Sequence, residues 1–276
     1  MYRDLKRPSA RIAQCLMLMH AVFNIFILIY LIYSSMRTRA DFLSKTFALS
    51  TELTFNSYKR VIVNDAYFRY FLNSLLILAG AILLLVALSS TVAYALGHYR
   101  FKGKKAFQIY FLIGLMFPIQ LGIVPVFLLM KNVGLIDTFL SVILICGSSI
   151  SMAVFLLTNF FADLPEEIYE AAILDGAGEF RTFLQIMFPL ASPVIFSMSI
   201  LTAMNIWNQI FIPMIFLQSD IRKTLPLLVM KYTNKLMMTM DAAFAVSVMT
   251  VVPILILFTI FSKNILNGIA EGGVKG

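Results

Sequence analysis

EEIYEAAILDGAGEFRTFLQIMFP, residues 166–189, is the stretch that decides the fold. It is a hydrophilic island in an apolar chain, because six of the fourteen acidic residues fall within residues 163–181 and long uncharged segments flank them. Asp163 can cap a helix, Pro165 is tolerated in its first turn, and Gly176 can end it. A second helix follows and must end near the final proline. The stretch therefore predicts a helix–turn–helix hairpin outside the membrane.

The first helix of this hairpin carries a narrow face of small side chains. Helical spacing places on that face Ile168, Ala171, Ala172 and Asp175. A face of this shape can fit into a groove of another protein. The alternative is a surface amphipathic hairpin without a partner.

Composition places the whole chain among membrane proteins. Of its 276 residues, 60% are hydrophobic and 13% are charged, whereas a soluble domain carries about a quarter charged residues. The net charge of +8 indicates anionic lipid headgroups rather than nucleic acid, because basic residues flank the apolar spans. Cys15 and Cys146 both lie inside apolar runs, so neither a disulfide framework nor a metal site is expected.

Long runs without charged residues predict six transmembrane helices. The runs cover residues 12–36, 70–97, 106–130, 138–162, 182–219 and 242–262. Each is long enough to cross a hydrocarbon core of about 30 Å, which takes roughly 20 helical residues. The fifth run also holds the second half of the hairpin, so its span begins near Leu190. No run alternates as a barrel strand would, so helices are the only spanning structure left.

The flanking charges predict the orientation. Basic residues precede the first span, whose apolar run is too long for a cleaved signal peptide. Four basic residues crowd the short loop at residues 100–105, and short loops weigh most in the positive-inside rule. We therefore expect both termini and the hairpin to be cytoplasmic, and residues 37–69 to form an external segment with short structure.

The loop at residues 98–105, HYRFKGKK, contains a glycine and a lysine pair that invite a nucleotide-binding interpretation. The glycine spacing is wrong, no strand precedes it, and Lys105 stands where a phosphate loop needs Ser or Thr. The loop is a basic turn, and any ATP must be bound by another polypeptide.

Two spans contain features that are costly in lipid. Prolines at 118 and 125 predict a bend in the third span, which is tolerated only against neighbouring helices or a water-filled path. Amides inside spans either bond neighbouring helices or line a route for a polar solute. Candidates for the path are Gln120, Asn205, Asn208 and Gln209. Of these, we expect Asn205 to bond a helix and Asn208 to face the path.

The hairpin resembles the EAA loop of bacterial binding-protein-dependent ABC importer permeases. The family pattern is EAA, three residues, Gly, nine residues, Ile, two residues and Pro. It falls on Glu170, Ala171, Ala172, Gly176, Ile186 and Pro189, with Phe188 where the family usually has Leu. In that family the loop is the coupling helix that docks on the cytoplasmic ATPase. The resemblance implies coupling roles for Glu167, Ile168, Glu170, Ala171, Ala172, Asp175, Gly176, Ala177, Ile186 and Pro189.

Further stretches resemble the sugar-importing branch, and specifically the maltose-type second permease. They are AYALGHYRFKGKK at 93–105, GLIDTFLSVIL at 134–144, WNQIFIP at 207–213, TLPLLV at 224–229 and the tail from residue 263. The likeness covers nearly all of the chain after residue 47. Gln209 stands where that branch often has Asp, so the solute is not specified.

The resemblance implies an all-α permease of six transmembrane helices, a single domain over residues 1–276. Its family core would cover about 70–264, with the coupling loop at 163–189 and the external segment at 37–69. It would work by alternating access, as a non-catalytic subunit that imports a sugar or oligosaccharide across the bacterial cytoplasmic membrane. A secondary transporter, or an ABC importer permease for another solute, is the alternative.

The resemblance also implies partners. They are a second permease in a heterodimer, a cytoplasmic ATPase dimer and an extracytoplasmic solute-binding protein that faces the external segment. ATP and Mg would be bound by the ATPase, so no cofactor is expected in this chain. The lipid bilayer surrounds it, and no nucleic-acid partner is expected.

Overall fold

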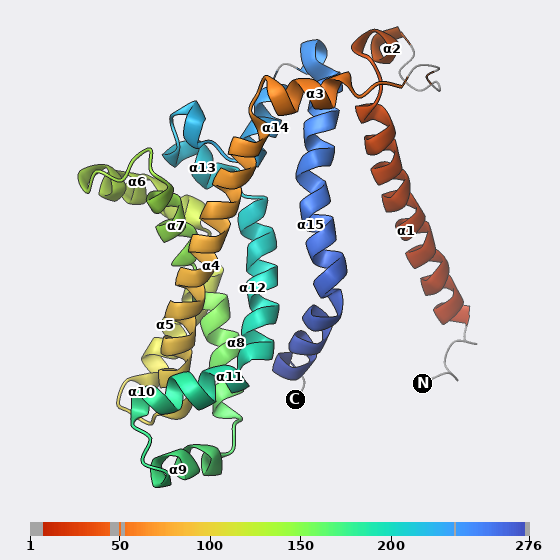
Figure 1. Ribbon diagram of the computed structural model, residues 1–276. Coiled ribbons are helices and arrows are strands. Elements are labelled where there is room, and N and C mark those ends of the chain that lie inside the picture. The colour runs from red at the N-terminus through yellow and green to blue at the C-terminus, as the bar shows by residue number, and fades with distance from the viewer. Residues whose placement is uncertain (1–7, 45–49, 51–52, 235, 274–276) are drawn as a thin grey trace. The chain divides into compact units, whose positions relative to one another are not determined.

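A computed structural model describes residues 8–44, 50, 53–234 and 236–273 (Figure 1). Helices account for the regular structure of these residues, apart from an isolated bridge between Arg37 and Leu53. The predicted all-α class is confirmed. The α-helices of the described residues are α1 (Pro8–Ser35), α2 (Arg39–Ser44), α3 (Asn56–Val63), α4 (Tyr67–His98), α5 (Lys104–Met116), α6 (Ile123–Asn132), α7 (Phe139–Gly147), α8 (Ser151–Ala162), α9 (Glu166–Leu174), α10 (Glu179–Thr182), α11 (Phe188–Leu190), α12 (Ser192–Trp207), α13 (Phe211–Phe216), α14 (Leu225–Thr233) and α15 (Leu236–Gly273).

Three further short segments connect these helices. Two are 3₁₀ turns, η2 (Ile119–Gly122) and η4 (Asp220–Arg222). The third, η3 (Phe183–Met187), is a π-helical segment between α10 and α11. Single-turn π segments inside helices frequently occur at functional sites.

Contacts divide the chain into two compact units. The first combines the chain up to Tyr67 with Leu228–Val252, and the second combines Phe68–Leu227 with the chain from Pro253 onward. The hairpin and every candidate path residue belong to the second unit. The single permease domain predicted from the sequence stays a prediction.

Helix lengths and apolar composition identify candidate membrane spans. Three single helices are long and apolar enough to cross a membrane: Ala10–Ser35, Tyr67–His98 and Thr239–Phe261. Three bent pairs pass the same test together: Lys104–Met116 with Ile119–Asn132, Phe139–Gly147 with Ser151–Ala162, and Glu179–Leu190 with Ser192–Trp207. The described residues therefore offer between three and six spans, depending on whether each bent pair counts as one.

The sharpest bend, 94°, lies at Phe117 and Pro118. Both residues have extended ψ angles, 113° and 135°, because a proline disfavours helical geometry in the residue before it and removes a backbone donor. Pro125 lies in the first turn of α6, where the missing N–H costs no hydrogen bond. The bend predicted in this part of the chain is confirmed, and the first proline makes it.

Two apolar clusters form the core of the second unit. One joins α4, α8 and α12 to the second half of the hairpin, through residues such as Tyr94, Leu157 and Met187. The other joins α4, α7 and α13.

A polar contact holds the loop before α7 in place. Asp137 accepts a hydrogen bond from the backbone of Ser219 and pairs with Arg222 at 2.6 Å. The Ser219 bond is the main cause that lowers the pKa of Asp137.

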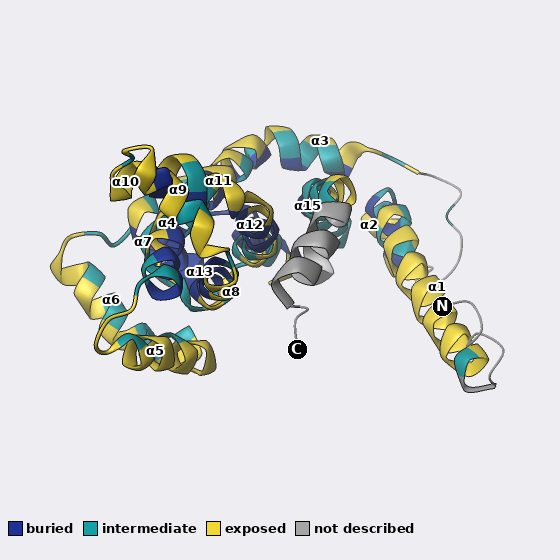
Figure 2. Ribbon diagram, turned by 90° about the horizontal axis from the view of Figure 1, so that it is seen from below, coloured by how far each residue is buried: buried dark blue, intermediate teal, exposed yellow. Residues whose placement is uncertain are grey.

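The first unit contains the long exposed helix α1 and the short helices α2 and α3 within residues 37–69. Side chains of α1 are exposed along most of its length (Figure 2), as expected for a helix in contact with lipid or another subunit. Asp241 of α15 pairs with Arg60 of α3 at 3.1 Å and accepts a hydrogen bond from Ser57 at 2.9 Å. The short structure predicted within 37–69 is therefore present as α2 and α3.

Candidate functional site

The first helix of the hairpin, α9, begins at Glu166. Pro165 is its N-cap residue, with extended backbone geometry, and no side chain caps the helix. Asp163 instead ends α8, and its backbone keeps near-helical angles of −88° and −7°. The predicted cap by Asp163 is wrong, because an N-cap residue needs extended geometry. Glu166 and Glu167 occupy the first turn, where the helix dipole favours negative charge.

Gly176 ends α9 as the sequence predicted. Its φ is +77°, a left-handed conformation that costs a residue with a Cβ about 1–2 kcal/mol. The Gly176 N–H donates to the carbonyl of Ile173 at 2.9 Å, and the Ala177 N–H donates to that of Ala172 at 3.0 Å. This pair of bonds is a Schellman motif, which satisfies the last carbonyls of the helix. The turn after α9 therefore depends on glycine.

The two faces of α9 differ from the expectation. Ile168 packs against the core of the second unit, and Ala172 is only 3% exposed. The opposite face is exposed and carries Glu167, Glu170, Ala171, Asp175 and, as its most prominent apolar side chain, Leu174 at 88% exposure. Because Ile168 and Ala172 hold the hairpin to its own chain, only the opposite face is open to a partner.

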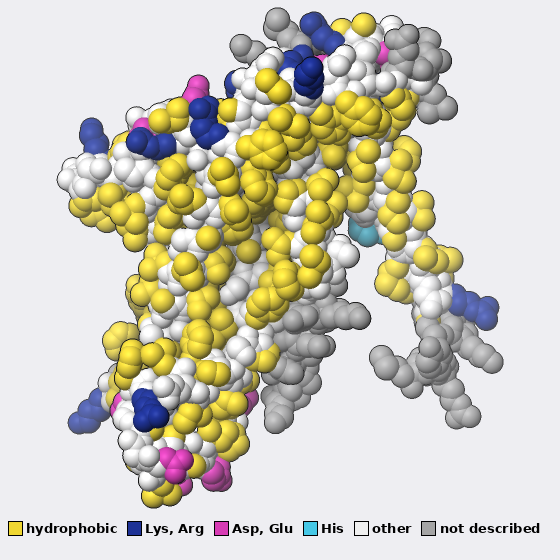
Figure 3. Space-filling model, viewed as in Figure 1, with side chains coloured by type: hydrophobic (Ala, Val, Ile, Leu, Met, Phe, Trp, Pro, Cys, Tyr) yellow, Lys and Arg dark blue, Asp and Glu magenta, His cyan; other side chains and the backbone are white. Residues whose placement is uncertain are grey.

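The second half of the hairpin also packs one side against the core of the second unit. Phe183 and Met187 are buried, whereas Ile186 is half-buried and Pro189 is exposed. Phe180 is 75% exposed. Figure 3 shows acidic side chains gathered at the end of the unit that the hairpin forms, and hydrophobic side chains covering the helices beyond it. Apolar side chains on this acidic surface are candidates for a protein contact.

Three side chains join the hairpin to the end of α4. The carboxylate of Glu179 accepts hydrogen bonds from the hydroxyls of Tyr99, just beyond α4, and Tyr169, on α9. The His98 ring lies 4.1 Å from the Tyr169 ring and stacks in parallel on the Tyr94 ring at 5.3 Å, measured between centroids. We call Tyr99, Tyr169 and Glu179 the clamp.

Both tyrosines of the clamp remain protonated donors. The hydrogen bond to Glu179 is the main cause that raises the pKa of Tyr169 to about 12. Burial, followed by the hydrogen bond to Glu179, raises the pKa of Tyr99. Hydrogen bonds to a charged acceptor are about twice as strong as neutral ones. The two bonds to Glu179 therefore fix the position of Tyr169 on α9, Glu179 on α10 and Tyr99 beyond α4 relative to one another.

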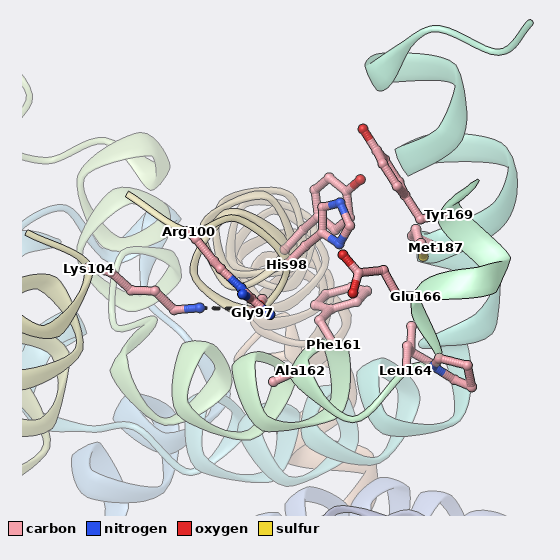
Figure 4. Close-up of a pocket in the computed structure, with 12 residues that line it drawn as sticks. Gly97, His98, Arg100, Lys104, Phe161, Ala162, Leu164, Glu166, Tyr169 and Met187 are labelled. Carbon is pink, nitrogen blue, oxygen red and sulfur yellow. Dashed lines mark hydrogen bonds between the residues drawn. The ribbon is translucent and has the colours of Figure 1, made fainter. Parts of the chain in front are cut away.

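A cavity of about 260 Å³ lies beside the clamp (Figure 4). Its lining includes His98, Arg100 and Glu166, and Figure 4 shows the Lys104 side chain directed toward the carbonyl of Gly97. That bond is 3.3 Å long, and a second one joins Lys104 to the carbonyl of Tyr99 at 3.1 Å. Lys104 thus binds one carbonyl at the end of α4 and one just beyond it, where a cation is favourable.

A second cavity, of about 520 Å³, contains two of the four candidate path residues. Asn205 of α12 and Gln209, just beyond it, line this cavity together with Thr202, Ser149 and Cys146. Mostly aliphatic side chains complete the lining: Ile119, Met152, Ala153, Leu156, Met198, Leu201, Met204, Ile206 and Ile212.

The other two path candidates are placed elsewhere. Gln120 is exposed on η2, beside the cavity-lining Ile119. Asn208 follows α12 and donates to the carbonyl of Met204, one turn back, at 2.9 Å. Asn205, expected to bond a neighbouring helix, lines the cavity, while Asn208, expected to face the path, bonds a carbonyl of its own helix. Their roles in the path stay predictions.

Sequence reasoning missed the clamp and two exposed apolar side chains of the hairpin, Leu174 on α9 and Phe180 on α10. A signal for the latter was present, because both are bulky apolar residues beside the turn of a hydrophilic hairpin. The clamp had no comparable signal, since Tyr99 and Glu179 lie 80 positions apart and only the fold brings them together.

Comparisons with known proteins agree with the resemblance. The family model described as "Binding-protein-dependent transport system inner membrane component" matches residues 89–270. A diacetylchitobiose uptake system permease protein of Streptomyces coelicolor is 31% identical over 269 residues, 96% of this chain and 89% of the relative. An arabinooligosaccharides transport system permease protein of Halalkalibacterium halodurans is 34% identical over 284 residues, 99% of this chain and 100% of the relative.

A solved structure has the same fold. It is the crystal structure of a bacterial ABC transporter involved in the import of the acidic polysaccharide alginate. The likeness has a TM-score of 0.80 at 22% identity, and it covers 93% of this chain and 98% of the other. With the family model spanning more than half of the chain, the conclusion is plain: this chain belongs to the family of binding-protein-dependent transport system inner membrane components.

Proposed function

We propose that this chain is the transmembrane permease subunit of an ATP-driven importer for a sugar or oligosaccharide. The observation that carries the proposal is the hairpin at 163–189, with the family pattern on a helix whose open face is available to a partner. The relatives named for diacetylchitobiose and arabinooligosaccharides support a saccharide as the solute. Family membership argues against a secondary transporter, while a permease for a non-sugar solute is the alternative that direct uptake measurements decide.

In this proposal the pairs α5–α6 and α7–α8 each cross the membrane as one span, and α12 crosses as the fifth span after the hairpin. With a cytoplasmic amino terminus, six spans return the carboxyl terminus to the cytoplasm. Irregular backbone at membrane depth is tolerated where protein or a water-filled cavity covers it, which supports counting each of these two pairs once. The hairpin then lies on the cytoplasmic side and the segment 37–69 on the opposite side. The apolar helices support an inner-membrane location for the chain.

The partners follow from this placement. An ATPase dimer, which binds ATP and Mg, docks on the open face of the hairpin. A sister permease completes the path, and a solute-binding protein delivers the saccharide at the external segment. Closure of the ATPase dimer moves the hairpin, and the clamp passes that movement to α4. No chemical step is assigned to this chain.

Contact with the ATPase uses those exposed members of the predicted set that lie on α9 and the turn after it, which are Glu167, Glu170, Ala171, Asp175 and Gly176. Leu174 and Phe180 add the apolar area that a stable contact needs. Ile168 and Ala172 serve instead to fix the hairpin to its own chain. The predicted set thus divides into a docking group and an anchoring group.

Two glycines of the same turn provide the test. An added Cβ meets nothing within 4 Å at either Gly176 or Gly178, but only Gly176 has a positive φ, whereas Gly178 has a φ of −73°. We expect Gly176→Leu to lower ATP-driven uptake about tenfold while membrane insertion and ATP hydrolysis persist, in line with the strain of about 1–2 kcal/mol. Gly178→Leu is the matched control and should remain close to wild type. Normal uptake with normal ATPase stimulation in Gly176→Leu would show that the coupling role is wrong.

A further inference from the structure

The cavity of about 520 Å³ borders three places where the helical backbone is interrupted. Ile119 follows the bend at Pro118, Cys146 and Ser149 flank the break between α7 and α8, and Gln209 lies between α12 and α13. Broken helices at membrane depth are characteristic of solute sites in transporters, because irregular backbone persists there only beside protein or water. This convergence marks the cavity as a place built to hold something polar.

One face of α12 and its extension supplies the polar groups of the cavity. Thr202, Asn205 and Gln209 are spaced by three and four residues, so they form a stripe along one side. In the described part of the chain, neither the Thr202 hydroxyl nor the Asn205 amide has a hydrogen-bond partner. The Gln209 side-chain oxygen accepts from the Phe211 N–H at 3.1 Å, which leaves its NH₂ group available. An unpaired amide in hydrocarbon is costly, so the stripe must meet water, a solute or a helix of another chain.

The composition of the cavity lining indicates that the stripe meets a solute rather than a helix of another chain. Helices that associate in membranes approach closely through small residues, whereas this cavity is walled by Met152, Met198 and Met204 with several leucines and isoleucines. Flexible methionines adapt to ligands of different shape. A hollow of about 520 Å³ with an adaptable apolar wall and a polar stripe has the character of a ligand site.

Charge defines the class of solute. None of the fourteen lining residues is acidic or basic. A carboxylated saccharide would need a cation or several donors to replace its water, whereas a neutral saccharide needs only hydroxyl and amide partners and an apolar surface for its C–H groups. We infer that the stripe of Thr202, Asn205 and Gln209 contacts the transported solute directly and selects neutral saccharides over acidic ones. The inference rests on the proposed function and adds a solute contact to this subunit.

Cysteine reactivity tests the inference in the assembled complex. In a background with Cys15→Ser and Cys146→Ser, single cysteines are introduced as Thr202→Cys and Asn205→Cys. Ala203→Cys on the same helix is the matched control, because Ala203 does not line the cavity. The complex in nanodiscs is treated with a charged methanethiosulfonate reagent, which reacts with thiolates in water but not with thiols in lipid. Modification of the chain is followed by mass spectrometry, without added saccharide and with two mixtures, one of neutral malto-, arabino- and chito-oligosaccharides and one of oligouronates.

We expect both lining cysteines to react about tenfold faster than Ala203→Cys, and the neutral mixture alone to slow them severalfold. Equal reactivity at all three positions would overturn the inference and identify the stripe as a helix contact. Equal protection by the oligouronates, or no protection by either mixture, would overturn it as well. Failure here leaves the proposed function standing if Gly176→Leu and Gly178→Leu still differ in ATP-driven uptake.

Discussion

Glu179 adds hydrogen bonds to the apolar contacts that join the hairpin to α4. Its carboxylate accepts hydrogen bonds from the hydroxyls of Tyr99, just beyond α4, and Tyr169, on α9. Because Glu179 is exposed, solvent screens part of its charge, so the two hydrogen bonds contribute only modestly to stability. The clamp therefore sets the position of α9 rather than the stability of the whole unit.

Glu179→Gln tests the clamp, since it keeps the size of the side chain and removes the charge that strengthens both bonds. We expect backbone hydrogen exchange in α9 to become about three- to tenfold faster, equivalent to about 1 kcal/mol of lost local stability, and ATP-driven uptake to fall with it. The measurement is hydrogen–deuterium exchange of the assembled complex. Glu170→Gln removes an equal charge from the open face and should leave exchange in α9 unchanged. Identical exchange in the two variants would show that the clamp does not hold α9.

At the scale of single residues, features that depend on local backbone conformation could be predicted from the sequence. The end of α9 at Gly176 was predictable because glycine adopts a positive φ at low cost. The cap by Asp163 was wrong because α8 continues up to that residue. The positions of the two asparagines were not predictable, because sequence alone does not show which side of α12 borders the cavity.

Helices α4 and α8 pack closely at the end of α4, just before Tyr99 of the clamp. A Cβ on Gly97 would lie 2.6 Å from the Cβ of Phe161 and 2.9 Å from the carbonyl oxygen of Thr158. Neither atom can move without shifting the backbone of α8. The residue that follows Gly97 is His98, whose ring contacts the tilted ring of Tyr169 on α9 at 4.1 Å between centroids.

We expect Gly97→Ala to destabilise the complex by roughly 1–3 kcal/mol, the usual cost of overpacking, and to lower its melting temperature in detergent. Gly114→Ala is the matched control. Its Cβ would lie 2.5 Å from the hydroxyl oxygen of Ser151, a side-chain atom that can rotate away. A melting temperature for Gly97→Ala equal to that of Gly114→Ala would contradict the close packing of α4 against α8.

Among the elements, the bend at Pro118 was predictable because proline imposes it. The break of 43° between α7 and α8 was not, because a Gly-Ser-Ser sequence at residues 147–149 carries no proline and the whole run is apolar. The π-helical segment η3 likewise has no signature in composition. Tertiary packing determines both features, so they are visible only in the folded chain.

At the scale of the whole molecule, the proposed function puts the segment 37–69 and the hairpin on opposite sides of the membrane, and this orientation can be measured. Ser57 is unsuitable for labelling, because it is 3% exposed and donates to Asp241. Exposed positions are Asn64 after α3 and Asp175 in the hairpin. In a background without native cysteines, we expect an impermeant thiol reagent on intact cells to label Asn64→Cys and not Asp175→Cys. Permeabilised cells provide the control, in which both should react. Labelling of Asp175→Cys alone in intact cells would reverse the orientation.

Composition and motif spacing predicted the membrane class and the family, because both are encoded along the chain. The surfaces that meet other subunits were less predictable. Ile168 and Ala172, which the sequence placed on the face for a partner, pack against the chain's own core. Sequence alone did not separate the two uses, because both a core and a partner groove select apolar side chains. Burial in the fold separates the two uses.

Photo-crosslinking of the complete transporter in native membranes tests the central claim most directly, namely that the ATPase docks on the open face of α9. A photoreactive residue replaces Leu174 on that face, and in a parallel variant it replaces Val63, which is 66% exposed on α3. The account predicts an adduct between this chain and the ATPase from position 174 and none from position 63. A complex that hydrolyses ATP but gives no ATPase adduct from position 174 would contradict it.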